Sequence, residues 1–184
     1  MNGVVYVTGN PHKAEYFAKM VGLDIPHMSI DVDEIQSIDL REVVEHKARQ
    51  AFELAKCPVI VEDTKLSFNA MGRLPGPFIK WFLEELDVDG LCELLNGYTD
   101  RTAIAGAAIA YYDGVTLEIF ERELFGSIAS TPAGDSGFGW NRIFIPQGSN
   151  KTLGEMDDAE FRKHYAQVKP FDAIADFLKS LDVE

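Results

Sequence analysis

The stretch Pro58-Val59-Ile60-Val61-Glu62-Asp63-Thr64 decides the fold class of this 184-residue chain. An apolar run that ends in acidic residues is typical of a buried strand in an α/β sheet. A second such strand, Val4-Val5-Tyr6-Val7, leads into Thr8-Gly9-Asn10-Pro11-His12-Lys13. Because ligands bind at the carboxyl ends of strands in open α/β sheets, the two ends predict one crevice that contains both anion donors and carboxylates. This combination indicates metal-dependent phosphate chemistry.

The segment after the first strand predicts a tight turn and then a helix. Asn10 suits the N-cap and Pro11 the first helical position, and apolar residues follow at helical spacing from Ala14 to Val21. The free N–H groups of the helix would face an anion, with Thr8, Asn10 and Lys13 beside it. The spacing of a Walker loop is absent. An ordinary turn with a solvated lysine is the alternative.

The acidic pair predicts a metal site. Glu62 and Asp63 are expected to leave the end of their strand together, where two carboxylates repel unless a cation or solvent intervenes. Mg²⁺ is the cation expected at such a site. Glu34, in the segment 31–37, is a third candidate ligand. A solvated turn is the alternative.

The block 135–146 places Phe138 and Trp140 on a backbone hinged by glycine, ahead of another short apolar strand. Glycine allows close approach to a flat ligand, and an aromatic ring offers a face for stacking. Aromatic residues of the hydrophobic core would give the same pattern.

Together, the motifs of this chain resemble those of the inosine/xanthosine triphosphate pyrophosphatase family in order and approximate spacing. They are Thr8-Gly9-Asn10-x-x-Lys13, Val61-Glu62-Asp63-Thr64, Leu74-Pro75-Gly76-Pro77-Phe78-Ile79-Lys80-Trp81-Phe82, Phe138-Gly139-Trp140 and Thr152-x-x-Glu155-Met156. The resemblance extends from Val4 to about Leu181. It implies an enzyme that hydrolyses non-canonical purine nucleoside triphosphates to the monophosphate and pyrophosphate, with Mg²⁺ and usually as a homodimer.

The resemblance also implies a role for each matching residue. The phosphates would be bound by Thr8, Asn10, Lys13, Lys47 and Lys80, with Thr64 and Trp140 also in the substrate site. The metal would be held by Glu34, Glu62 and Asp63, and Asp63 would be the general base for the attacking water. Phe138 would stack on the base.

The positions that recognise the base in the family differ in this chain. The family usually has F-G-W-D where Asn141 stands here, and this substrate-site residue can donate a hydrogen bond where aspartate only accepts. In a gapless alignment, the family's E-K-N corresponds to Glu160-Phe161-Arg162 of this chain. The family's S-H-R corresponds to Tyr165-Ala166-Gln167. A changed base preference is therefore expected. Alternatively, Arg162, Lys163 or His164 restores the same contacts from a neighbouring position.

Composition limits the remaining function classes. The chain has 46% hydrophobic residues, enough for a single domain over 1–184, and a formal net charge of −13, which argues against a nucleic acid polymer as partner. No apolar run reaches the length of a membrane span, no signal peptide is evident, and Cys57 and Cys92 form no metal or disulfide pattern. A cytoplasmic protein without membrane contact is expected.

The remaining elements follow from periodicity and turn residues. A helix over 40–56 should begin with a capping box of Asp39 and Glu42, and a hairpin of 102–112 with 115–127 should turn at Asp113-Gly114. Further helices are expected over 78–86, 89–95, 157–165 and 170–181. The predicted fold is α/β, with a mixed elongated central sheet flanked by helices and two lobes around a nucleotide-binding cleft.

Two classes of function remain open on the sequence. One is an active nucleoside triphosphate pyrophosphatase, and the other is a non-catalytic nucleotide-binding regulatory relative. Retention of Asp63, Glu62 and the lysines favours the enzyme, because closely placed like charges cost stability. A phosphatase for other metabolites is disfavoured, since Phe138 and Trp140 would have no base to stack on. The preferred base and sugar are not determined.

Overall fold

The structure is a computed structural model that describes residues 3–137 and 139–181, with the side chain of residue 12 left out. The strands are β1 (Val5–Val7), β2 (His27–Met28), β3 (Val59–Phe68), β4 (Pro75–Gly76), β5 (Thr102–Tyr112), β6 (Leu117–Ile128) and β7 (Phe144–Pro146). The helices are α1 (Pro11–Val21), α2 (Leu40–Ala55), α3 (Ile79–Glu93), α4 (Asp158–Val168) and α5 (Phe171–Leu181). Short 3₁₀ turns are η1 (Asn69–Met71), η2 (Gly139–Arg142) and η3 (Leu153–Glu155).

The strands form one mixed sheet in the order β2-β1-β3-β5-β6-β7, with β4 also paired to β3. β1 runs parallel to β2 and β3, whereas β4 is antiparallel to β3 and β7 is antiparallel to β6. The predicted α/β class with a mixed sheet is therefore confirmed. β2 was not predicted, because it is two exposed residues long and has no apolar pattern.

The chain divides into two compact units. Unit 1 contains residues 3–63, 107–121 and 169–181 of the described chain, and unit 2 contains 64–106 and 122–168 apart from residue 138. The long strands β3, β5 and β6 contribute residues to both units. The predicted cleft between two lobes stays a prediction.

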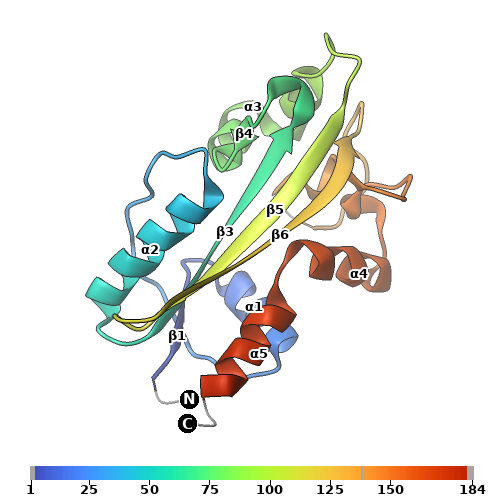
Figure 1. Cartoon of the computed structure of the whole chain (residues 1–184). Helices are drawn as coiled ribbons and strands as arrows, with labels where there is room; N and C mark the ends of the chain where they lie inside the picture. Colours follow the sequence, from blue (N-terminus) through green and yellow to red (C-terminus); the bar gives the residue numbers. More distant parts are fainter. Residues whose placement is uncertain (1–2, 138, 182–184) are drawn as a thin grey trace. The chain divides into compact units, whose positions relative to one another are not determined.

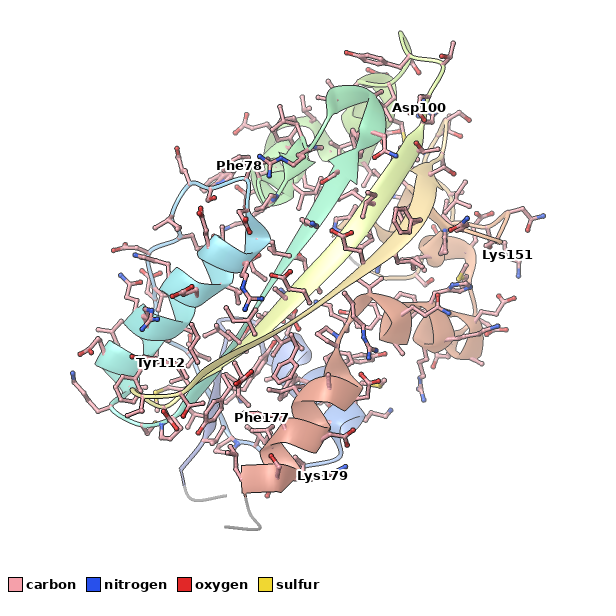
Figure 2. The ribbon with its side chains drawn as sticks, in the orientation of Figure 1. Phe78, Asp100, Tyr112, Lys151, Phe177 and Lys179 are labelled. Carbon is pink, nitrogen blue, oxygen red and sulfur yellow. The ribbon has the colours of Figure 1, made fainter. Side chains whose placement is uncertain are left out.

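In unit 1, helices cover both faces of the sheet (Figure 1). On one face, α2 packs its buried Leu40, Val44, Ala48 and Ala51 against Val5, Val7, Val59, Val61, Ala108 and Ala110. On the other face, the Phe17 ring of α1 stacks on Tyr6 at 4.3 Å and also contacts Phe171 of α5. Further along α5 is Phe177, labelled in Figure 2. Its ring lies 5.1 Å from that of Tyr111. Neighbouring residues of β1 and β3 therefore face different helices.

In unit 2, α3 packs against η2, and the chain is bent at Asp87 (φ 55°). The predicted helices over 78–86 and 89–95 are thus two helical segments that meet at this residue. The core includes Phe68, Leu91, Leu95, Ile143, Phe144 and Leu153, all fully buried. The Thr152 and Glu155 motif is a capping box at η3, in which the Thr152 N–H donates to Glu155 at 2.8 Å.

Three local predictions need correction. β3 does not end at Glu62 and Asp63 but continues to Phe68, because Leu66 and Phe68 resume the buried pattern. The capping box at α2 is indirect: the Asp39 N–H donates to Ser37, whose hydroxyl donates to Glu42. The N-cap itself is confirmed, since the Asp39 side chain accepts from Arg41 N–H at 2.9 Å.

The hairpin turn lies one residue later than predicted. The Asp113 N–H donates to the Thr116 carbonyl, so Gly114 (φ 97°) and Val115 are the central residues rather than Asp113 and Gly114. The reason is that the Asp113 carboxylate accepts the N–H groups of Val115 and Thr116 at 2.9 and 2.7 Å. This fixes Asp113 as the first corner of the turn.

Candidate active site

A cavity of about 200 Å³ opens in unit 1 at the carboxyl end of β1. Its lining includes five of the predicted site residues, namely Thr8, Lys13, Glu34, Lys47 and Glu62. Asp31 also lines it, although only its neighbour Glu34 was singled out from the sequence. Residues from positions 8 to 62 therefore come together at this strand end.

The α1 side of the cavity is built by the turn that follows β1. The Asn10 N–H donates to Thr8 Oγ1 at 3.1 Å, and Asn10 Oδ1 accepts the Lys13 N–H at 3.3 Å. Asn10 is thus the N-cap that the sequence predicted, and the first turn of α1 begins beside the cavity. The positive end of a helix dipole and a hydroxyl at this place favour an anion.

A lysine between two carboxylates forms the opposite side. Lys47 of α2 lies 2.9 Å from Glu34 Oε1 and 3.3 Å from Asp63 Oδ2. Burial opposes the charge of Lys47, but the charges of Asp63 and Glu34 outweigh it, so the pKa of Lys47 is raised. Glu34 lies on an irregular segment that Asp33 anchors to α2, through a 3.0 Å hydrogen bond from Gln50 Nε2. Two carboxylates therefore converge on one cation position.

Glu62 and Asp63 do not form a side-by-side pair. Neighbouring residues of a strand point to opposite faces, and the contacts agree: Asp63 reaches Lys47 of α2, whereas Glu62 reaches Lys13 of α1. The prediction that both leave a strand end together is wrong, because β3 continues past them. Their proposed roles as metal ligands are not tested by this finding.

The buried partner of Glu62 is Lys169, which lies between α4 and α5. Lys169 Nζ is 2.5 Å from Glu62 Oε1, and the two side chains are 3% and 5% exposed. Burial alone would raise the pKa of Glu62, but the charges of Lys169 and Lys13 outweigh it, so that pKa is lowered. Lys169 was missed from the sequence, where the only signal is a lysine between Val168 and Pro170.

The charges of the cavity fit a divalent cation. Its lining has the ammonium groups of Lys13 and Lys47 and three carboxylates, those of Asp31, Glu34 and Glu62. Glu62 is paired with the buried Lys169, and a divalent cation would lower the repulsion between a bound polyanion and the other two carboxylates. In the described part of the chain, no three His, Cys, Asp or Glu side chains form a metal cage. Mg²⁺ does not need one, since it is held by one or two carboxylates, water and substrate phosphates. Glu34 and Asp63, which both contact Lys47, would supply such a pair.

The remaining predicted site residues lie in unit 2 or outside the described residues. Lys80 is exposed on α3, with its Nζ 5.1 Å from the Trp81 ring, and Thr64 is half-buried on β3. The half-buried Trp140 ring packs edge-on against Phe144 at 5.6 Å, so part of it belongs to the core. Phe138 lies outside the residues that the structure describes.

Asn141 is only 2% exposed, and its Nδ2 is a buried donor for which the described residues supply no partner. A Cβ at Gly137 (φ 85°) would lie 2.4 Å from this atom, so glycine is required there. An unsatisfied buried donor costs about 1–3 kcal/mol. The side chain therefore favours any acceptor that can reach it.

The segment at the other altered positions is helix α4. Phe161 stacks on the buried Tyr165 at 5.0 Å, and the Ala166 carbonyl accepts from Arg122 at 3.3 Å. Arg162 is half exposed and lies 3.6 Å from Asp158, and Lys163 is exposed. Phe161 and Ala166 therefore make structural contacts within unit 2.

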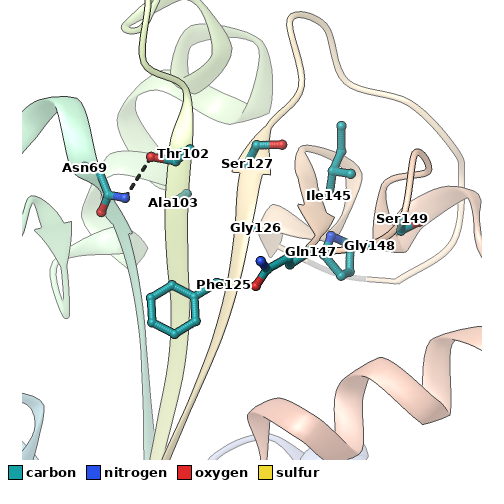
Figure 3. Close-up of a pocket in the computed structure, with 11 residues that line it drawn as sticks. Asn69, Thr102, Ala103, Phe125, Gly126, Ser127, Ile145, Gln147, Gly148 and Ser149 are labelled. Carbon is teal, nitrogen blue, oxygen red and sulfur yellow. Dashed lines mark hydrogen bonds between the residues drawn. The ribbon is translucent and has the colours of Figure 1, made fainter.

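A larger cavity, of about 620 Å³, lies in unit 2 (Figure 3). Its lining includes Asn69, which donates to Thr102 at 2.8 Å, together with Phe125 and Gln147. The lining has no charged side chain. This cavity therefore lacks the groups that a triphosphate or a metal ion needs.

No helix in the described part of the chain is long and apolar enough to cross a bilayer.

Comparison with known proteins agrees with this geometry. The model of the Ham1 family matches residues 4–177. Inosine triphosphate pyrophosphatase of Schizosaccharomyces pombe is 37% identical, over 98% of this chain and 97% of its own length. Inosine triphosphate pyrophosphatase 1 of Trypanosoma cruzi is 39% identical, over 85% and 82%.

Solved structures share the fold. A HAM1 protein from Coxiella burnetii superposes with a TM-score of 0.84 at 23% identity, covering 98% of this chain and all of the other. A nucleoside-triphosphatase / dITP/XTP pyrophosphatase from Mycobacterium abscessus gives 0.77 at 21% identity, covering 93% of this chain and 97% of the other.

Proposed function

Because this chain belongs to the Ham1 family, we propose that it hydrolyses non-canonical purine nucleoside triphosphates to the monophosphate and pyrophosphate. Relatives named as inosine triphosphate pyrophosphatases match nearly its whole length and identify it as a nucleoside triphosphate pyrophosphatase. The family predicted from the sequence motifs is therefore confirmed. The substrate, the metal and the role of each residue are our proposal.

One observation carries the proposal. The cavity at the end of β1 combines a helix N-terminus, Thr8 and Lys13 with Glu34 and Lys47, and Lys47 also contacts Asp63. Cleavage of a phosphoanhydride needs charge neutralisation and positioning, together with a group that accepts a proton from water. The donors on the α1 side would bind the phosphates, and Lys47 and Lys80 would join them.

Mg²⁺ is the proposed cofactor, held by Glu34 and Asp63 with Glu62 nearby. When bound, it would neutralise phosphate charge and favour an ionised nucleophile. Asp63 would accept the proton of the water that attacks between the α and β phosphates. Its side chain is 20% exposed, so water can reach it, and Lys47 Nζ, 3.3 Å away, holds the carboxylate in place.

We propose that the base preference differs from that of the family. Asn141 has a buried donor without a partner among the described residues, where the family has an acceptor. Phe161 and Ala166 are engaged in contacts within their own unit and carry no cation. Selectivity for inosine or xanthosine triphosphate over adenosine triphosphate is therefore expected to be weak.

Pyrophosphate release tests this proposal across a panel of nucleoside triphosphates, with Mg²⁺ and with EDTA. Asp63→Asn should abolish turnover while nucleotide binding stays largely intact, because a general base is needed mainly in the transition state. Stepwise release of orthophosphate would contradict cleavage between the α and β phosphates. Full activity of Asp63→Asn would refute the assigned base.

A homodimer is part of the proposal. Trp81 is 56% exposed beside the half-buried Phe78 and Phe82, a face larger than a short helix needs for its own packing. A second copy of the chain would cover it.

A further inference from the structure

The buried pair of Glu62 and Lys169 has no assigned role in the proposed reaction. Glu62 lies within β3 and Lys169 joins α4 to α5, and both side chains are almost fully buried. At 3% exposure, Lys169 is too enclosed to touch a nucleotide in the cavity. Lys169 contacts the site through its ion pair with Glu62.

The same carboxylate oxygen has a second lysine near it. Glu62 Oε1 lies 2.5 Å from Lys169 Nζ but 3.6 Å from Lys13 Nζ. Lys13 is 30% exposed and lines the cavity, so it is the lysine that a phosphate can reach. The two ammonium groups thus share one oxygen, and the buried one has the shorter contact.

A buried carboxylate keeps a cationic partner, because an unpaired buried charge is strongly destabilising. If Lys169 had no charge, Lys13 would be the cation left beside Glu62. Its ammonium group would then be drawn from 3.6 Å into a close ion pair with Glu62, and it would be less available to a phosphate in the cavity. With Lys169 in place, the charge of Glu62 is already matched.

We propose that Lys169 is a positioning residue, which neutralises Glu62 and so keeps Lys13 available to bind phosphate. The inference rests on the proposed function only in that Lys13 binds phosphate. The effect on phosphate binding comes from the charge of Lys169 rather than from the volume of its side chain.

The experiment measures binding of inorganic tripolyphosphate to the metal-free protein by calorimetry. Lys169→Met should weaken binding about ten-fold, which corresponds to the loss of one charge-assisted contact. Lys169→Arg keeps the charge and should bind like the wild type. Lys179→Met is the matched control, because its ion pair with Asp176 is on the surface of α5, and it should have no effect.

A second comparison separates this role from a structural one. Removing Glu62 as well, in Glu62→Gln/Lys169→Met, should restore tripolyphosphate binding, because no carboxylate remains to attract Lys13. If Lys169→Met does not fold, Lys169→Gln keeps an N–H donor for Glu62 and is compared with Glu62→Gln/Lys169→Gln. Wild-type affinity of Lys169→Met or of Lys169→Gln, or no recovery in the corresponding double variant, would overturn the inference.

The outcome is independent of turnover. If the wild type released no pyrophosphate from any nucleotide, the proposed function would fail while the binding comparison would still decide the role of Lys169. If the wild type released pyrophosphate normally and Lys169→Met bound tripolyphosphate like the wild type, only the positioning role would be refuted.

Discussion

Replacing Lys47 with Met tests whether Glu34 and Asp63 share a cation site. In the metal-free protein, the change leaves the two carboxylates together without the ammonium group that lies 2.9 and 3.3 Å from them. The part-buried contact with Asp63 is worth about 1.5–3 kcal/mol. The contact with Glu34, which is 43% exposed, is worth about 0.2–1 kcal/mol. A loss of at least about 2 kcal/mol lowers the Tm by roughly 4–8 °C for a chain of this size.

Mg²⁺ should reverse much of this loss. A ligand at about a hundred times its Kd stabilises the folded state by about 2.7 kcal/mol. In the variant, Mg²⁺ binds the two carboxylates without competing with a lysine. The rise in Tm on adding Mg²⁺ should therefore be larger in the variant than in the wild type. Scanning calorimetry with EDTA and with Mg²⁺ measures both effects.

The matched control is Lys56→Met. The ion pair of Lys56 with Glu53 lies on the surface, because the two side chains are 71% and 70% exposed. Its Tm should be unchanged in both conditions. Equal Mg²⁺ shifts in the wild type and Lys47→Met would refute the idea that Lys47 holds the two metal ligands together.

Four further outcomes are expected. Lys13→Met and Lys80→Met should each lower kcat/KM by about ten-fold through the loss of a phosphate contact, and unchanged kinetics in both would make these lysines solvated surface. Asn141→Asp should raise the preference for inosine over adenosine triphosphate by about 1–3 kcal/mol in kcat/KM, and an unaltered ratio would remove Asn141 from base recognition. The pKa of Asp113 is lowered because, against its burial, the carboxylate accepts the N–H groups of Thr116 and Val115. Asp113→Asn should therefore be less stable than the wild type above the ordinary pKa of 3.8, and the difference should vanish as the pH falls through the folded-state pKa, as urea titrations at several pH values would measure. Light scattering should give the mass of a dimer at micromolar concentration and of a monomer for Trp81→Glu; a monomeric wild type would contradict the proposed interface.

Local chemistry allowed several features to be predicted from sequence. The cap at Asn10 and the apolar spacing of Phe17 and Val21 specify α1, and they act within a few residues of each other. The N-cap Asp39 was found for the same reason. The hairpin turn was placed one residue early, because both Asp113 and Gly114 suit a turn and the carboxylate contacts that choose between registers cannot be read from residue types.

The sequence by itself determined the family, the α/β class and the residues that line the cavity on its α1 side, because motifs and periodicity are encoded over short stretches. Tertiary structure decided how the charges are paired. β3 continues beyond Asp63, so Glu62 and Asp63 face different helices, and Lys169 meets Glu62 across 107 positions of chain. Such pairs form because burial forces each charge to find a partner, and which partner is within reach depends on how the helices pack on the sheet.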